Sequence, residues 1–214
     1  MLQNALYTLE GWINGLPPSI VRVRPGLISL RGALSAMKGN LAEANHLLDN
    51  AIVVCQRKGD VAGIALTLVR RANTLRILGK YDASLKDIEE ALQLAGSDTD
   101  LQPIYAEALR IKGLSLYRLG QARTAAQELE HSLSLYTELK EAGSIPILLG
   151  ETAMVHATIG DVESAKTLYQ EALQIWRAEK NLYFQADTLN NLAVLYHQLG
   201  EYELASEAYE DGLA

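Results

Sequence analysis

The sequence predicts an all-α protein, a solenoid of antiparallel helix pairs stacked at a period of about 40 residues. The first observation is a set of five glycines at intervals of 40, 41, 40 and 40 residues: Gly39, Gly79, Gly120, Gly160 and Gly200. Each glycine follows one apolar helical stretch and precedes another. A fixed period of this length indicates units that bury a shared core only by stacking on their neighbours. Stacked helical repeats mostly form binding surfaces, which points away from catalysis.

The second observation is that other places within the unit repeat in step with the glycines. If the units begin at residues 25, 65, 106, 146 and 186, the fourth place is always large and apolar, and the eighth is always small. The fourth places are Ile28, Leu68, Leu109, Leu149 and Leu189, and the eighth places are Gly32, Ala72, Gly113, Ala153 and Ala193. The twentieth and twenty-seventh places are small and the twenty-fourth is Leu, Ile or Tyr, again at helical spacing. Small residues let two helix backbones approach closely while the large ones fill the space beside them.

These columns predict helix pairs in order along the chain. The predicted pairs are 26–38 and 41–58, 61–78 and 81–95, 101–119 and 122–142, 146–159 and 162–179, and 182–199 and 202–214. The repeated glycine supplies the left-handed backbone that often ends a helix. Asn40 and Asp161 are suited to cap the helix that follows, whereas Lys80, Gln121 and Glu201 are poorer caps.

Both ends of the chain depart from the repeat. Leu2, Leu6, Leu9 and Ile13 have helical spacing, and Pro17 with its neighbours must end that helix. We therefore expect residues 1–18 to be a helix left from a preceding unit plus a turn. Repeats at 25–64, 65–105, 106–145, 146–185 and a truncated 186–214 follow, so that 1–214 is a single array excised from a longer protein. Exposed apolar faces at both ends would favour end-to-end self-association.

Composition excludes several classes of protein. The 214 residues are 49% hydrophobic, but no run of 18 apolar residues or signal peptide occurs, which predicts a cytoplasmic protein without a membrane span. The single cysteine, Cys55, suits a reducing compartment and is expected to be a buried, inert thiol. Residues 161–214 carry three Lys or Arg against ten Asp or Glu, a net charge of −7, which argues against direct nucleic-acid binding.

The last unit resembles the tetratricopeptide repeat family. Its matching positions are Leu192, Ala193, Tyr196, Gly200, Tyr202, Ala205, Tyr209 and Leu213. This resemblance implies a right-handed superhelical solenoid in which the first helix of each pair lines a concave groove. Two features differ from the family: the proline that usually closes the unit is missing, and the period is about six residues longer than the usual 34.

Residues 12–52 have a second resemblance, to the start of the helical repeat region in MalT-like regulators of the LuxR type. Those proteins are signal-transduction ATPases with numerous domains (STAND). The matching positions are Trp12, Leu16, Pro17, Arg24, Pro25, Leu27, Gly39, Ala44, Leu48 and Ala51. The resemblance implies a sensor region that recognises an inducer or contacts partner domains in transcription regulation. The alternative is a generic tetratricopeptide scaffold for complex assembly, with no ATPase in its parent.

No motif in the sequence indicates catalysis. A Gly-x-x-x-x-Gly-Lys-Ser/Thr phosphate loop is absent, as are a Gly-x-Ser-x-Gly elbow and a His-Glu-x-x-His metal motif. The histidines His46, His131, His156 and His197 have no metal-ligand partner at helical spacing. His156 occupies the eleventh place of its unit, where a partly buried structural histidine is expected. We therefore expect no enzyme, no cofactor and no metal.

The family resemblance projects a set of inward-facing residues from the first helices onto this chain. The candidate binding residues are Asn73, Arg76, Arg110, Tyr117, Arg118, Met154, Asn190 and His197. Arginine forks suit a carboxylate or phosphate, so the expected partner is a protein, a peptide or an acidic small-molecule inducer. The alternative is that these arginines are solvated or paired with neighbouring Glu residues. The seventh place, usually buried in the family, is basic in three units (Arg31, Arg71 and Lys112), which indicates either a shifted helix rotation or charged tips directed outward.

Overall fold

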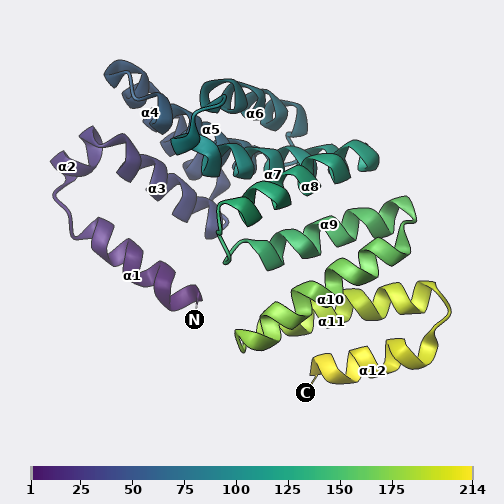
Figure 1. Cartoon of the computed structure of the whole chain (residues 1–214). Coiled ribbons are helices and arrows are strands. Elements are labelled where there is room, and N and C mark those ends of the chain that lie inside the picture. Colours follow the sequence, from purple (N-terminus) through teal and green to yellow (C-terminus); the bar gives the residue numbers. More distant parts are fainter. Residues whose placement is uncertain (1, 214) are drawn as a thin grey trace. The chain divides into compact units, whose positions relative to one another are not determined.

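The computed structural model describes the backbone of residues 2–213 and the side chains of residues 8–213, and the described chain is built from α-helices without strands. Figure 1 shows α1 (Leu2–Asn14) and α2 (Pro18–Val23) leading into a series of further helices. These are α3 (Pro25–Met37), α4 (Leu41–Lys58), α5 (Val61–Ile77), α6 (Tyr81–Ala95), α7 (Gln102–Arg118), α8 (Ala122–Glu138), α9 (Ile145–Ile159), α10 (Val162–Ala178), α11 (Leu182–Gln198) and α12 (Tyr202–Leu213). A short 3-10 helix, Thr99–Leu101, precedes α7. The expected all-α class is confirmed, and most predicted helix ends agree to within one residue.

The chain forms two compact units, residues 1–115 (unit 1) and 116–214 (unit 2), and the division along the sequence falls within α7. In unit 1, α3 packs on α4 and α5 on α6, and in unit 2, α9 packs on α10 and α11 on α12. Two details differ from expectation: α8 ends at Glu138, four residues early, and α2 forms directly after the proline pair. Pro18 occupies the first turn of α2, where its missing N–H costs nothing. A single array over residues 1–214 stays a prediction.

The five repeat glycines end the first helix of each pair as expected. Their φ angles lie between 74° and 84°. The next residue donates its backbone N–H to the carbonyl five residues earlier at 2.9–3.0 Å, as in Asn40 to Ser35 and Glu201 to Tyr196. This 6→1 bond defines the Schellman motif, which satisfies a helix-end carbonyl and requires a left-handed residue before the donor.

Three of the second helices end in the same way, which the sequence analysis missed. Gly59, Lys140 and Lys180 adopt φ of 65°, 58° and 54°, and each is followed by the same 6→1 bond. Two of these residues are lysines, which carry a Cβ and are uncommon in left-handed backbone. The turn therefore has the same geometry at positions 140 and 180, where the residue is lysine and not glycine.

Helix caps follow the expectation only in part. The Asp161 carboxylate accepts a hydrogen bond from the Ser164 N–H at 3.3 Å, as predicted. The prediction for Asn40 was wrong because its side chain makes no capping bond. The polar contact at that turn comes instead from Ser35, whose hydroxyl donates to Glu43 at 2.8 Å. Asp60 caps α5 through the Gly63 N–H at 2.8 Å, a cap that the repeat glycines did not indicate.

The core follows the repeat columns. All five fourth-place side chains are buried, from Leu68 at 1% exposed to Leu189 at 7%. Gly32 shows why the eighth place must be small: a Cβ there would lie 2.7 Å from Leu48 Cγ. The twenty-fourth place is buried at Leu48, Ile88, Leu129 and Tyr169, but Tyr209 on α12 is 40% exposed.

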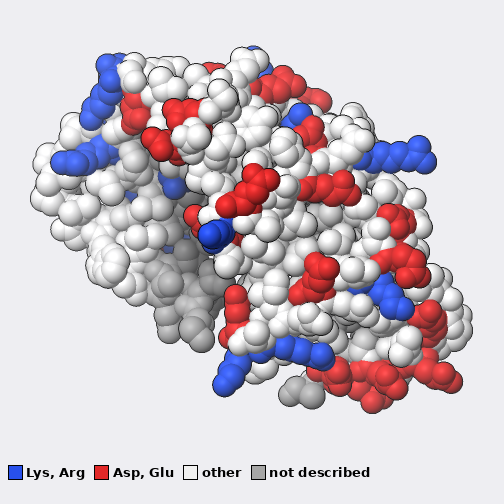
Figure 2. Space-filling model, viewed as in Figure 1, with Lys and Arg blue, Asp and Glu red and all other residues white. Residues whose placement is uncertain are grey.

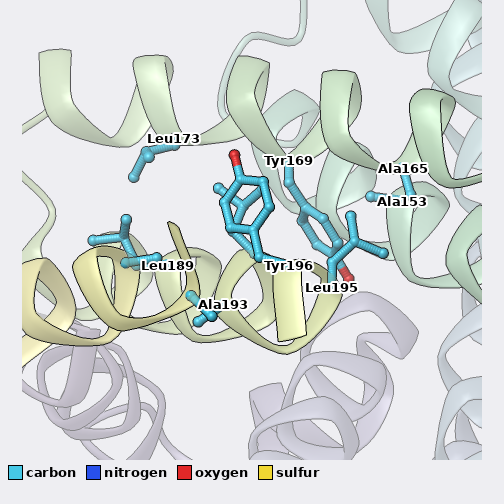
Figure 3. Close-up of a cluster of buried hydrophobic side chains, with 11 residues drawn as sticks. Ala153, Ala165, Tyr169, Leu173, Leu189, Ala193, Leu195 and Tyr196 are labelled. Carbon is cyan, nitrogen blue, oxygen red and sulfur yellow. The ribbon is translucent and has the colours of Figure 1, made fainter. Parts of the chain in front are cut away.

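Tyrosines fill much of the core of unit 2. Figure 3 shows the rings of Tyr169 from α10 and Tyr196 from α11 directed between the two helices, with Leu173, Leu189 and Leu195 around them. Beyond this cluster, Trp176 of α10 stacks on Phe184 of α11, with ring centroids 4.5 Å apart. Large aromatic rings fill the space that the small eighth and twentieth places leave open.

The predictions for the two ends are tested only in part. The Leu2 and Leu6 side chains lie outside the described residues, whereas Ile13 is buried and Trp12 is 71% exposed. Leu213, at the other end of the described chain, is 89% exposed. End-to-end self-association stays a prediction. None of the helices described is both long and apolar enough to cross a membrane.

Candidate functional site

The eight predicted binding residues divide between the two units. Asn73, Arg76 and Arg110 belong to unit 1, and the other five belong to unit 2. The predicted residues therefore form two groups, one in each unit.

In unit 1, the predicted residues bond to neighbours on their own helix. The Arg76 guanidinium donates to the Asn73 side-chain oxygen from Nε at 3.2 Å and from Nη2 at 2.9 Å. Arg110 Nη1 pairs with Glu107 Oε1 at 2.9 Å, one helical turn away. The pairing of Arg110 with a neighbouring Glu is the alternative that the sequence left open.

A different arginine of unit 1, Arg70, is partly buried and bonded to a neutral side chain. Its side chain lies on α5, is partly buried, and donates from Nη1 to the Ser29 hydroxyl of α3 at 2.9 Å. Among the side chains of residues 8–213, no carboxylate forms an ion pair with it. Burial lowers the pKa of the Arg70 guanidinium, because the charged form has lost part of its hydration.

The Ser29 hydroxyl that holds Arg70 is itself held by a polar contact. The Thr67 hydroxyl lies 3.1 Å from Ser29 Oγ and 2.7 Å from the Gly63 carbonyl oxygen, and both Ser29 and Thr67 are 1% exposed. The bond from Arg70 to Ser29 therefore holds one edge of the guanidinium in place. It uses one of the five N–H donors of the arginine. The remaining donors suit a ligand that brings negative charge.

Arg71, the next residue, has a structural role. It donates to both carboxylate oxygens of Asp87 on α6, each at 2.7 Å, and to Asp49 on α4 at 2.7 Å. These hydrogen bonds raise the pKa of the guanidinium, led by the bond to Asp87. The basic residue at the seventh place of this unit, Arg71, therefore forms ion pairs that link α5 to α4 and α6.

The surface of unit 2 contains a hollow of about 210 Å³ on α9, α10 and α11. Its lining includes the predicted residue Met154, together with Thr158, Tyr169, Asn191 and Val194. Tyr117 borders it, because its hydroxyl lies 3.2 Å from the Thr158 hydroxyl. Burial raises the pKa of Tyr169 to about 12, with further contributions from Asp187 and Tyr117.

Three predicted residues do not line this hollow. Asn190 and Arg118 are exposed, and His197 packs edge-on against the Tyr202 ring at 5.3 Å. The neighbouring Asn191 lines the hollow instead of Asn190. A shift of one residue around the helix accounts for the exchange, because adjacent positions differ by about 100°.

Two other titratable side chains, His156 and Cys55, are buried. His156 is 8% exposed, and its ring nitrogens lie 2.8 Å from Glu130 and 3.1 Å from Asp161. Burial and then Asp60 raise the pKa of the Cys55 thiol, which is 1% exposed. The buried positions expected for these two side chains are confirmed. No group of three or more potential metal ligands occurs in the part of the chain that the structure describes.

With this geometry established, the family can be assigned. The tetratricopeptide repeat family model matches residues 63–138 and 144–214. The chain belongs to the tetratricopeptide repeat family. A search of curated protein sequences finds no match.

Solved structures show the same tetratricopeptide repeat fold at low sequence identity. BtubC from P. vanneervenii is 18% identical, with 87% of this chain and 77% of that chain covered and a TM-score of 0.75. A Rap protein complexed with competence and sporulation factor is 18% identical, with coverage of 99% and 57% and a TM-score of 0.79. A STAND protein with a tetratricopeptide repeat sensor, from Pyrococcus horikoshii, is 18% identical, with coverage of 88% and 28% and a TM-score of 0.74. The chain thus spans little more than half of the Rap protein and less than a third of the STAND protein.

Proposed function

We propose that this chain is a non-catalytic binding module that recognises a carboxylate-bearing segment of a partner protein through the first helices of unit 1. The observation that carries the proposal is Arg70, a partly buried guanidinium that has a hydroxyl partner but no carboxylate partner among the described side chains. A partly desolvated charge is costly when unpaired, so a carboxylate that docks here gains more than it would on a solvated arginine.

The nearby polar groups fit the same ligand. Asn73 and Arg76 lie on α5 within two turns of Arg70, and their side chains are bonded to each other. A hydrogen bond to a charged group contributes about 1.5–3 kcal/mol, equivalent to roughly 10- to 100-fold in affinity. One such contact gives selectivity for an acidic segment, while the stacked helices supply the remaining contact area.

We propose further that the module serves as the sensor region of a larger cytoplasmic regulator of the MalT-like STAND class, with a role in signal transduction and transcription. The support is the resemblance over residues 12–52 together with the fold shared with a STAND tetratricopeptide repeat sensor. The fold shared with a Rap protein in complex with a signalling factor favours a peptide or protein as the sensed molecule. The alternative is a scaffold for complex assembly without an ATPase.

The test uses peptides that differ only in charge. A fluorescein-labelled library of hexapeptides with Glu at the last two positions and a free carboxyl terminus is titrated with the protein. A matched library carries Gln there and a terminal amide. Fluorescence anisotropy should show binding of the acidic library and at least tenfold weaker binding of the neutral one.

A pair of variants then locates the site. Arg70→Gln removes the proposed contact, and Arg57→Gln removes an equal charge from an exposed position on α4. We expect Arg70→Gln to weaken binding about tenfold or more and Arg57→Gln to leave it unchanged, with similar melting temperatures for both. Equal binding by the two variants would reject the Arg70 site.

A further inference from the structure

A second groove lies in unit 2 between the second helices α8 and α10. Its volume is about 690 Å³, within the range of ligand-binding clefts. The buried side chains of Thr152 and His156, from α9, lie between those two helices. No residue of the predicted binding set lines this α8–α10 groove. It is therefore independent of the surface proposed above.

The apolar part of the groove is supplied by leucines that are anchored in the core. Leu133 of α8 and Leu168 of α10 are partly buried and pack against the cluster of Leu149, Ala172 and Trp176. Their remaining surface faces the groove in a fixed position. Such a surface can take up the aliphatic carbons of a ligand.

The polar part of the groove offers acceptors and hardly any donors. Three carboxylates line it, those of Glu130, Glu138 and Glu163, and an ionised carboxylate only accepts hydrogen bonds. The lining threonine hydroxyls donate to carbonyl oxygens of their own helices, with Thr137 to Leu133 at 2.8 Å as one example. Thr152 and Thr167 make the same type of bond, at 2.7 and 2.9 Å. The lining Ser134 hydroxyl donates to the Glu138 carboxylate at 3.2 Å.

His156 does not change this balance. Its two ring nitrogens face Glu130 at 2.8 Å and Asp161 at 3.1 Å, so any ring hydrogens are directed to carboxylates and away from a ligand. The pKa of Asp161 is lowered by hydrogen bonds from Ser164 and by His156. Among the residues that the structure describes, no lysine or arginine lines the groove. Even with a protonated imidazole, the carboxylates outnumber the positive charges.

The carboxylates are spaced along the groove. Glu130 and Glu138 lie eight residues apart on α8, which corresponds to about 12 Å along the helix axis. One ammonium group cannot reach both, whereas residues four apart in an extended peptide are roughly 13 Å apart. Acidic side chains also gather elsewhere in unit 2, over α12, on the face shown in Figure 2.

We propose that the α8–α10 groove binds a basic segment of a partner protein. Lysine or arginine side chains of that segment donate to the row of Glu130, Glu138 and Glu163. Their aliphatic carbons rest on Leu133 and Leu168. The charge and the acceptor-only lining select for these side chains, and the length of the row selects for a segment over a single cation.

The test uses the full chain and a fluorescein-labelled decapeptide of alternating Lys and Leu. The groove variant is Glu138→Gln with Glu163→Gln. The control variant is Glu171→Gln with Glu179→Gln, which removes the same charge from exposed positions of α10 and its C-cap outside the groove. We expect fluorescence anisotropy to show about tenfold weaker binding by the groove variant and less than a twofold change in the control. Amide hydrogen exchange should slow in α8 and α10 when the peptide is bound.

Three results would overturn the proposal. The first is no measurable binding of the Lys-Leu peptide. The second is an equal loss in both variants, which would indicate diffuse electrostatic attraction. The third is binding of spermine as tightly as the peptide, with the same loss in the groove variant, which would indicate a site for small polyamines. None of these results affects the Arg70 proposal, which concerns unit 1 and a ligand of the opposite charge.

Discussion

Replacing Asp87 by alanine should lower the free energy of unfolding far more than replacing any exposed acidic residue on α6. The Asp87 side chain is only 8% exposed and receives two hydrogen bonds from Arg71, whose side chain is 23% exposed. Without Asp87, this largely buried guanidinium keeps one partner, Asp49, which is 51% exposed. The free energy of unfolding should therefore fall because a buried charge has lost its compensation.

The size of the expected loss follows from how exposed the Asp87 and Asp49 side chains are. Removing one partner of a buried pair costs about 3–5 kcal/mol, and the remaining Asp49 contact places Asp87→Ala at the lower end, about 3 kcal/mol. Asp49→Ala breaks an exposed contact and should cost no more than about 1 kcal/mol. The double variant Arg71→Met with Asp87→Leu should recover most of the loss, because it leaves no buried charge.

Urea unfolding followed by far-ultraviolet circular dichroism measures these differences. Glu89→Ala, at an exposed position of α6, is the matched control and should lie within about 0.5 kcal/mol of the unmodified chain. If Asp87→Ala destabilised the chain no more than Glu89→Ala does, the ion pair between α4, α5 and α6 would have no structural role and the reasoning would fail.

Three further predictions concern backbone, packing and thiol chemistry. Lys180→Gly should raise the free energy of unfolding by about 0.5–1 kcal/mol, because it removes the backbone strain of a lysine with positive φ. Gly160→Ala should lower the free energy of unfolding by a similar amount or more. Urea titrations measure both changes. Gly32→Ala should cost about 1–3 kcal/mol and lower the melting temperature, since its Cβ would lie 2.7 Å from Leu48 Cγ, and a melting temperature equal to that of the unmodified chain would contradict this packing. Cys55 should react with a disulfide reagent at pH 8 much more slowly in the folded chain than in urea, because its pKa is raised and its thiolate is scarce; equal rates would show that the thiol is accessible.

The repeat columns were predictable because they record steric requirements. A place that meets a neighbouring backbone must be small in every unit, and a place that ends a helix requires a left-handed residue. Both leave the same residue type at the same interval, as in Gly32 and Ala72. The left-handed lysines, Lys140 and Lys180, left no such trace, because the turn forms there despite the residue type.

The candidate site was harder to predict because polar side chains choose partners across helices. The family resemblance pointed to Asn73 and Arg76 but could not show that their side chains bond to each other. Arg70 occupies a place that holds a leucine in the preceding unit and an isoleucine in the next, so no column marked it. Its importance depends on burial and on the absence of a carboxylate partner among the described side chains, which only three-dimensional contacts reveal.

The shared turn that ends the first helices has a consequence for how such a chain changes in length. The turns at Gly39 and Gly79 have φ of 82° and 74° and the same 6→1 bond, so the backbone leaves both in nearly the same conformation. A gene segment spanning residues 40–79 could be duplicated or deleted, and the new junction would reproduce an existing one. Growth by whole helix pairs therefore requires no compensating substitution at the splice, only matching faces on the helices that become neighbours.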